Sequence, residues 1–192
     1  MREDPESVKA KIIEAFIMEF NADGTKLNLD NVAKRIHISK KTIYRYFSSK
    51  TDIYNAIIDG SHRYVHQRQK EIYESEGKNP EEKLFEILTI ETPFEAILDF
   101  NRVFEVREYE PLVYHQLVKS YSDQWVYPLM LIEEGKRTGW IRKDVNPTLV
   151  IAYLTSSMNQ LYSQDLLQKA GVTYKEAINH LARCIVAGIK AR

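Results

Sequence analysis

Cysteine is almost absent from this sequence. Cys184 is the single one, and one cysteine excludes an intrachain disulfide framework. Glycine (7) and proline (6) are few among 192 residues, whereas a strand-rich sandwich or barrel needs more turn-forming residues. The first residues, MREDPESVKAK, contain no apolar signal-peptide core, and no apolar run approaches the length that crosses a bilayer. We therefore expect an α-helical, cytoplasmic protein without membrane contact.

Signatures of catalysis and of metal binding are missing as well. No glycine-rich phosphate loop, nucleophile elbow or zinc-protease motif occurs, so we do not expect an enzyme. His62 with His66, and His180 with Cys184, have the helical spacing of a pair of metal ligands. Neither pair has a third ligand at a recognisable spacing, which favours solvated or packed side chains. We predict no metal and no cofactor.

The chain does contain a succession of helix signals. Asp4 and Pro5 can open a first helix, whose apolar residues recur at helical spacing until Gly24 ends it. Asn28 can cap a short helix and Ser39 a second one, with only the tight turn IHIS between them. Two short helices joined by a tight turn and braced by a longer helix are the elements of a helix-turn-helix.

The remaining three quarters of the chain also carries helix signals. A long helix begins at Ser49 and ends at SEGKNP, and later helices are separated by Pro93, by Pro111 and by the segments EEGKRTG, DVNP and KAGVT. The predicted fold class is all-α, with about nine helices. Residues 1–50 would form a three-helix head, and residues 51–192 a larger helical domain.

Two helices near the C-terminus are more apolar than one core face requires. After Pro147, the run TLVIAYLTSSMNQLY is apolar on nearly every side. Thr173 and Glu176 form a capping box that opens a last helix with one wide apolar face. We expect helices near 147–164 and 174–190 to form a homodimer interface, and closure of a monomeric core is the alternative.

Positive charge is concentrated in one stretch of a chain that has 27 cationic and 27 acidic side chains. Residues 30–50 carry six cationic side chains and one carboxylate, so this segment is net +5 and the rest is net −5. On a helix that follows Ser39, the outward side chains would be Lys40, Lys41, Tyr44 and Arg45. The inward side chains would be Ile43 and Phe47. A basic, hydrogen-bonding helix face fits the major groove of DNA, so DNA is the predicted partner.

The run LDNVAKRIHISKKTIYRYFSSKTDIYNAI resembles the DNA-binding module of TetR-family (TetR/AcrR) transcriptional regulators. The shared features are an alanine in the first short helix, the tight turn, a Thr-aliphatic-Tyr-x-x-Phe core, a Ser-Lys pair and a long fourth helix. The resemblance covers roughly residues 6 to 60, and EEGKRTGWIRKDVNPTLVIAYL is similar to the segment before the family's dimerising helices. One residue departs from the pattern: His37 stands in the turn where the family usually has glycine. Histidine tolerates a left-handed backbone better than most residues, which leaves a slightly altered helix angle open.

The resemblance implies a homodimeric transcription factor, typically a repressor, that binds a palindromic operator in double-stranded DNA. Its C-terminal domain would bind a small-molecule effector that changes the separation of the two heads. Positions that match DNA contacts of the family are Ser39, Lys40, Lys41, Thr42, Tyr44 and Tyr46. Lys50 matches a phosphate-binding lysine, and Asn28 is placed to reach the DNA backbone. For Arg45 the choice is between a DNA contact and a solvated side chain, and for Tyr44 between DNA and a neighbouring helix.

An effector pocket is predicted from the aromatic residues of segment 94–131, on the helices where the family places its ligand. The candidate lining residues are Phe100, Phe104, Tyr121 and Trp125. Arg107 or Glu105 could pair with a charged ligand group, while the plainer interpretation of most of these aromatics is ordinary core. The alternative function, suggested by His37 in the turn, is a helical small-molecule-binding or interaction protein without DNA binding.

Overall fold

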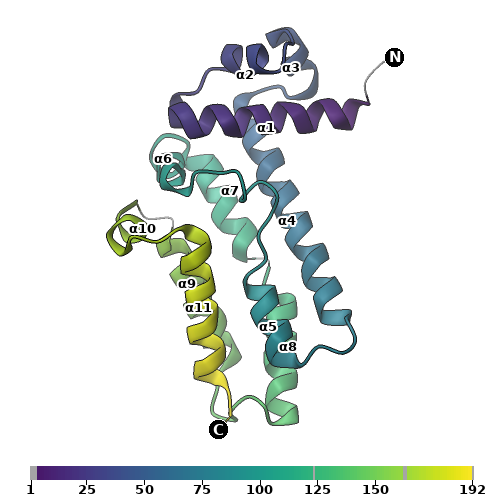
Figure 1. Cartoon of the computed structure of the whole chain (residues 1–192), viewed down its shortest axis with the longest axis vertical. Coiled ribbons are helices and arrows are strands. Elements are labelled where there is room, and N and C mark those ends of the chain that lie inside the picture. Colours follow the sequence, from purple (N-terminus) through teal and green to yellow (C-terminus); the bar gives the residue numbers. More distant parts are fainter. Residues whose placement is uncertain (1–3, 123, 162–163, 192) are drawn as a thin grey trace. The chain divides into compact units, whose positions relative to one another are not determined.

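The computed structural model describes residues 4–122, 124–161 and 164–191. These residues form eleven α-helices and two short 3-10 helices (Figure 1). The elements are α1 (Pro5–Asp23), η1 (Gly24–Lys26), α2 (Leu29–Arg35), α3 (Lys40–Tyr46), α4 (Lys50–Glu74), α5 (Pro80–Leu88), η2 (Phe100–Arg102), α6 (Val103–Tyr109), α7 (Pro111–Ser122), α8 (Val126–Thr138), α9 (Pro147–Leu161), α10 (Gln164–Ala170) and α11 (Tyr174–Ile189). The predicted all-α class is confirmed. The number exceeds the nine or so expected because short helices such as α6 and α10 stand as separate elements.

The chain divides into two compact units. The first comprises residues 1–61 and 93–117, and the second comprises residues 62–92 and 118–192. Helix α4 therefore contributes its first part to one unit and its second part to the other. The segment predicted as the head, residues 1–50, lies in the first unit together with α6 and most of α7.

Local capping signals determine where the helices of the first unit begin. Pro5 occupies the first turn of α1, and Gly24, with φ 61°, follows its last residue. The Asn28 side chain accepts a hydrogen bond from the Asp30 N–H at the start of α2, and Ser39 accepts one from the Thr42 N–H at the start of α3. Helix α2 packs on both α1 and α3 (Figure 1). The predicted helix-turn-helix is thus present.

The turn between α2 and α3 passes through His37, whose φ is 56°. The His37 N–H donates to the Lys34 carbonyl (3.2 Å), and the Ile38 N–H donates to the Ala33 carbonyl (3.0 Å). This pair of bonds is a Schellman motif, in which the residue just after the helix must adopt a left-handed conformation and is usually glycine. The turn keeps its geometry with histidine, as the sequence predicted.

Replacing His37 with glycine is expected to stabilise the protein by about 0.5–1 kcal/mol. Glycine removes a left-handed strain of about 1–2 kcal/mol and loses part of that gain to its greater freedom in the unfolded chain. Urea denaturation of the native protein and of His37→Gly measures the difference. A lower midpoint for His37→Gly would show that the imidazole makes a stabilising contact that outweighs the strain.

The second unit has its own core, formed by α5, α8, α9 and α11. Helix α5 packs on α8 and α11, and α9 packs on α8 and α11. The most deeply buried side chains of this core include Leu84, Ile132, Ile141 and Leu154. Thr173 and Glu176 form the predicted capping box at the start of α11. None of the described helices combines the length and the apolar character that crossing a bilayer requires.

Candidate nucleic-acid interface

Helix α3 is held in one orientation by its buried side. Ile43 is 0% exposed, and Phe47, which follows the helix, is 7% exposed. Both belong to the hydrophobic cluster that includes Phe16 of α1 and Val32 of α2. Because these contacts fix the rotation of α3, the side chains on its opposite face are turned toward solvent.

The solvent-facing side of α3 carries the predicted basic and hydrogen-bonding groups. Ser39, Lys41, Tyr44 and Arg45 are exposed, and Tyr44 is 48% exposed despite its aromatic ring. Lys40, Thr42 and Tyr46 are partly buried. The structure records no ion pair for Lys41 or Arg45 with any described residue. The predicted residues of α3 therefore lie on one short helix that offers two cations and an aromatic hydroxyl to a ligand.

Several predicted contact residues also hold the local structure together. Lys40 Nζ lies 2.9 Å from Asp30 Oδ2, and this hydrogen bond raises the pKa of Lys40. Ser39 Oγ and Thr42 Oγ1 are 2.9 Å apart, in addition to the cap that Ser39 provides. Asn28 is exposed, with its amide oxygen engaged at the start of α2. A DNA contact by these side chains, which stays a prediction, requires that these bonds be kept or exchanged.

Lys50, at the start of α4, is held by two groups of the first unit. Its Nζ donates to the Thr25 carbonyl at 2.5 Å and lies 3.2 Å from Glu110 Oε1. The ammonium also lies 5.9 Å from the centre of the Tyr54 ring. The lysine assigned to a phosphate is thus partly neutralised by a carboxylate that lies sixty residues further along the chain.

Thr25 is the point at which α6 reaches the turn before α2. Its N–H donates to Glu105 Oε2 at 3.0 Å, while its carbonyl accepts from Lys50. The Glu105 carboxylate approaches Gly24 so closely that a Cβ there would lie 1.8 Å from Oε2. The positive φ of Gly24 favours glycine, and any side chain at this position would also have to displace the Glu105 carboxylate.

Arg35 contributes to the positive charge of the segment but has a structural partner. Its Nη2 lies 2.6 Å from Oε1 of Glu19, and its Nε donates to the same oxygen at 2.7 Å. Glu19 is 7% exposed, so its carboxylate depends on this bidentate donor in place of water. Arg35 links α1 to α2 and is not part of the exposed face of α3.

Replacing Arg35 with alanine is expected to lower the free energy of unfolding by about 1–3 kcal/mol, because Glu19 would remain buried without its donor. Lys34→Ala, an exposed neighbour on the same helix, is the matched control and should change stability by less than about 0.5 kcal/mol. Chemical denaturation measures both variants. Equal stabilities would mean that water replaces the guanidinium at Glu19 without loss.

An apolar pocket of about 80 Å³, partly open to solvent, lies in the first unit. Its wall is formed by hydrophobic side chains of α1, α4, α6, α7 and the segment before η2: Phe16, Ile17, Phe20, Tyr54, Ile57, Ile58, Leu98, Val103, Val106, Val113 and Leu117. The hydroxyl of Tyr54 is buried without a hydrogen-bond partner among the described residues. Burial, together with the nearby carboxylates of Glu110 and Glu105, raises the pKa of Tyr54.

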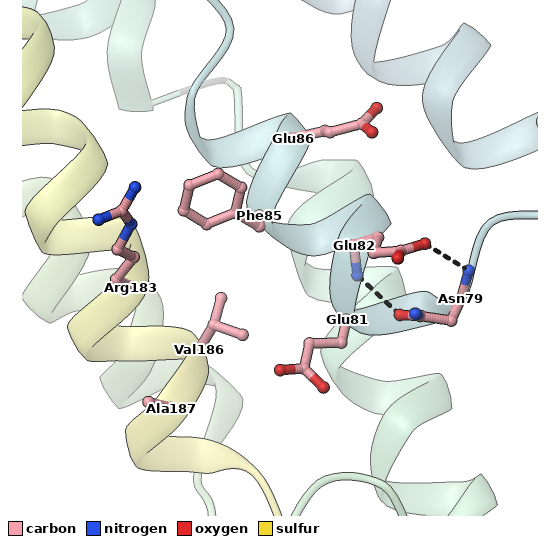
Figure 2. A pocket seen from close by; sticks show the side chains of 8 residues that line it. All are labelled: Asn79, Glu81, Glu82, Phe85, Glu86, Arg183, Val186 and Ala187. Carbon is pink, nitrogen blue, oxygen red and sulfur yellow. Dashed lines mark hydrogen bonds between the residues drawn. The ribbon is translucent and has the colours of Figure 1, made fainter.

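An open groove of about 530 Å³ lies in the second unit, between α5 and α11 (Figure 2). Its α5 side is acidic, and its carboxylates are engaged: Glu82 in the capping box with Asn79, Glu81 with Lys190, and Glu86 with Lys78. Arg183 and Phe85 project from opposite sides of the groove. The charged groups of its rim are largely satisfied within the chain.

The residues predicted to line an effector pocket do not come together in either cavity. Phe100 and Phe104 are partly buried in the first unit. Trp125 precedes α8 in the second unit, and its buried indole N–H has no partner among the described residues. Tyr121 belongs to α7, and its side chain lies outside the described residues. The assignment of these four to a ligand stays a prediction.

Among the described residues, no group of three histidine, cysteine or acidic side chains is arranged to hold a metal ion. His180 and Cys184 are exposed on α11. His66 packs against the Tyr127 ring at 5.5 Å, and His62 is partly buried. The histidine pairs thus have packed or solvated positions.

Comparison with known proteins shows that the helix-turn-helix segment is similar to a protein family. Residues 12–57 match the sequence pattern of "Bacterial regulatory proteins, tetR family". Over 168 residues, the chain is 26% identical to the uncharacterized HTH-type transcriptional regulator YvaF of Bacillus subtilis (strain 168), and the match covers 88% of each chain.

Solved structures share the fold over nearly the whole chain. The fatty acid degradation regulator FadR from Bacillus halodurans is 16% identical, with a TM-score of 0.69 and full coverage of both chains. The transcriptional regulator FadR from Bacillus subtilis, in complex with stearoyl-CoA, is 18% identical, with a TM-score of 0.61 and coverage of 94% of this chain and 98% of that one. At these identities the likeness concerns the arrangement of helices.

Proposed function

We propose that this chain, whose residues 12–57 match the TetR family of bacterial transcriptional regulators, acts in the cytoplasm as a homodimeric repressor of a palindromic operator. A small-molecule effector releases it from the DNA. This assignment includes a non-enzymatic role, in keeping with the family of transcription factors to which the chain is similar.

The observation that carries the proposal is the exposed face of α3. Ile43 and Phe47 hold the helix so that Lys41, Tyr44 and Arg45 point away from the core. A helix that presents cations and a hydroxyl beside one another suits the major groove, where phosphates position the protein and base edges specify the sequence. This face is flanked by Lys40, Thr42 and Tyr46. Lys50 binds a DNA phosphate once its ammonium group leaves the Glu110 carboxylate.

Titration of a fluorescent 30-base-pair duplex of mixed sequence, followed by anisotropy, tests DNA binding itself. We expect micromolar or weaker affinity at physiological salt, falling linearly on a log–log plot as salt rises, since cation contacts release counterions from phosphates. A fluorescently labelled uncharged polysaccharide of similar length is the negative control, because it has no phosphate groups. Absence of binding at low salt would contradict the proposal.

The dimer is proposed to form through α9 and α11. On α9, Val150 and Leu154 are buried in the unit's own core, while Leu149 and Tyr153 are 49% and 60% exposed. Large apolar groups one helical turn apart on an otherwise well-packed helix need a covering partner. A second copy of the chain supplies one by twofold symmetry.

Tyr153→Glu is expected to shift the protein from dimer to monomer, because a charged carboxylate would replace an exposed aromatic ring in the proposed interface. Sedimentation velocity at micromolar concentration measures the shift, which should reach at least tenfold in the dissociation constant. Arg137→Glu, on the exposed surface of α8, is the control for added negative charge. An unchanged dimer in Tyr153→Glu would place the interface elsewhere.

A further inference from the structure

The ammonium group of Lys50 is engaged by several groups of the first unit. Its Nζ donates to the Thr25 carbonyl at 2.5 Å and lies 3.2 Å from Glu110 Oε1. The side chains of Lys50 and Glu110 are each 26% exposed, so water and salt screen this ion pair less than a pair on the open surface. A DNA phosphate that takes this lysine therefore competes with a carboxylate of the protein's own chain.

Glu110 is fixed by the ends of two helices. It directly follows α6 and directly precedes Pro111, the first residue of α7. Its N–H donates to the Val106 carbonyl at 2.9 Å, and its carbonyl accepts from the Tyr114 N–H at 3.0 Å. Because both backbone groups are bonded, the carboxylate cannot follow the lysine without disturbing a helix end. The ammonium of Lys50, on a flexible four-carbon stem, is the member of the pair that moves.

Transfer of the Lys50 ammonium to a phosphate has two costs at Glu110. The carboxylate loses the cation with which it pairs, and it then lies near a second negative group. Neither cost arises when residue 110 is neutral. The neighbouring carboxylate of Glu105 is engaged elsewhere, because it accepts from the Thr25 N–H at 3.0 Å and lies 3.3 Å from Arg102 Nη1. Glu110 is thus the acidic group that opposes a phosphate contact by Lys50.

We propose that Glu110 determines how strongly this regulator binds DNA, by competing with phosphate for Lys50. The inference rests on the proposed function, because it concerns a DNA contact of the same head. A phosphate contact carries no sequence information, so the competition lowers the affinity for an operator and for an unrelated duplex by the same factor. Glu110 therefore limits the strength of binding, while the choice of sequence is left to α3.

Anisotropy titration of Glu110→Gln with the 30-base-pair duplex of mixed sequence measures the competition. Glutamine keeps the size of the side chain and removes its charge, and we expect binding to become at least about threefold tighter. The slope of log affinity against log salt should become steeper by up to about one, because Lys50 then reaches the phosphate without leaving a carboxylate. Glu108→Gln is the matched control, since it removes the same charge from an exposed position of α6. It should change the affinity by less than about 1.5-fold, because salt screens a charge at this position.

A double-mutant cycle with Lys50→Met assigns the gain to this pair of residues. In the Lys50→Met protein, Glu110→Gln should change the affinity by less than about 1.5-fold, because no ammonium remains to be released. Urea denaturation shows whether each variant is folded. Glu110→Asp, whose carboxylate is drawn back by one methylene, should give a smaller gain in the same direction, and it takes the place of the glutamine variant should that one unfold.

Three results would overturn the inference. The first is that folded Glu110→Gln binds the duplex no more tightly than Glu108→Gln. The second is weaker binding by Glu110→Gln, which would mean that the carboxylate orients Lys50 toward the phosphate. The third is a gain that persists in the Lys50→Met protein. Failure of the proposed function looks different, because the native protein and all of its variants would then bind no duplex.

Discussion

Replacing Lys41 and Tyr44 together with alanine should lower operator affinity by about 2–4 kcal/mol, a factor of roughly 30 to 1,000. Both side chains are exposed on α3, and no described residue forms an ion pair with Lys41. Their loss removes one cation and one aromatic hydroxyl from the surface assigned to DNA. The slope of log affinity against log salt should also fall by about one, because one phosphate contact disappears.

The control for this double variant is its own stability. Since neither side chain is buried, the free energy of unfolding should stay within about 0.5 kcal/mol of the native value. Anisotropy titration and urea denaturation on the same preparation separate the two effects. Native affinity in the folded double variant would remove this face of α3 from the DNA interface.

Ile43→Ala should produce the opposite pattern, a loss of about 2–5 kcal/mol in the free energy of unfolding. Ile43 is 0% exposed, and its side chain fixes α3 against α1 and α2. The substitution leaves a cavity in the hydrophobic cluster that holds α3. DNA binding should decline through partial unfolding of the head, so that lowering the temperature restores it.

Leu112→Ala is a suitable comparison, since Leu112 is 82% exposed at the start of α7. It should change stability by no more than about 0.5 kcal/mol. Thermal denaturation by circular dichroism distinguishes the two variants. If Ile43→Ala were as stable as Leu112→Ala, the packing of α3 on the head would not depend on this residue.

Local chemistry made much of the head predictable. Asn28 and Ser39 begin α2 and α3 because their side-chain oxygens accept backbone N–H groups within the next three residues. The left-handed turn at His37 is likewise set by a helix end and the residue after it. The orientation of α3 follows from the spacing of Ile43 and Phe47, and the exposed basic side is its complement.

Contacts between segments far apart in the sequence could not be predicted from local sequence patterns. Lys50 meets Glu110, and Thr25 meets Glu105, only because α6 folds back on the head, and no local pattern specifies that approach. The same holds for the cavity, since helical spacing marks Phe16 or Val106 as buried without saying whether the space between them is filled. The four aromatic residues predicted to line a pocket rest on the aromatic composition of their segment and on where the family places its ligand, and neither distinguishes lining residues from core residues.

Selection of bound duplexes from a random DNA pool, with purified protein at two salt concentrations, tests the central claim most directly. We predict enrichment of a palindromic site whose two half-sites lie about one helical turn, or a multiple of it, apart, as two symmetry-related heads require. The enrichment should sharpen at the higher salt, where non-specific phosphate contacts weaken. A pool that remains random at both salt concentrations would contradict the account of this protein as a sequence-specific DNA-binding regulator.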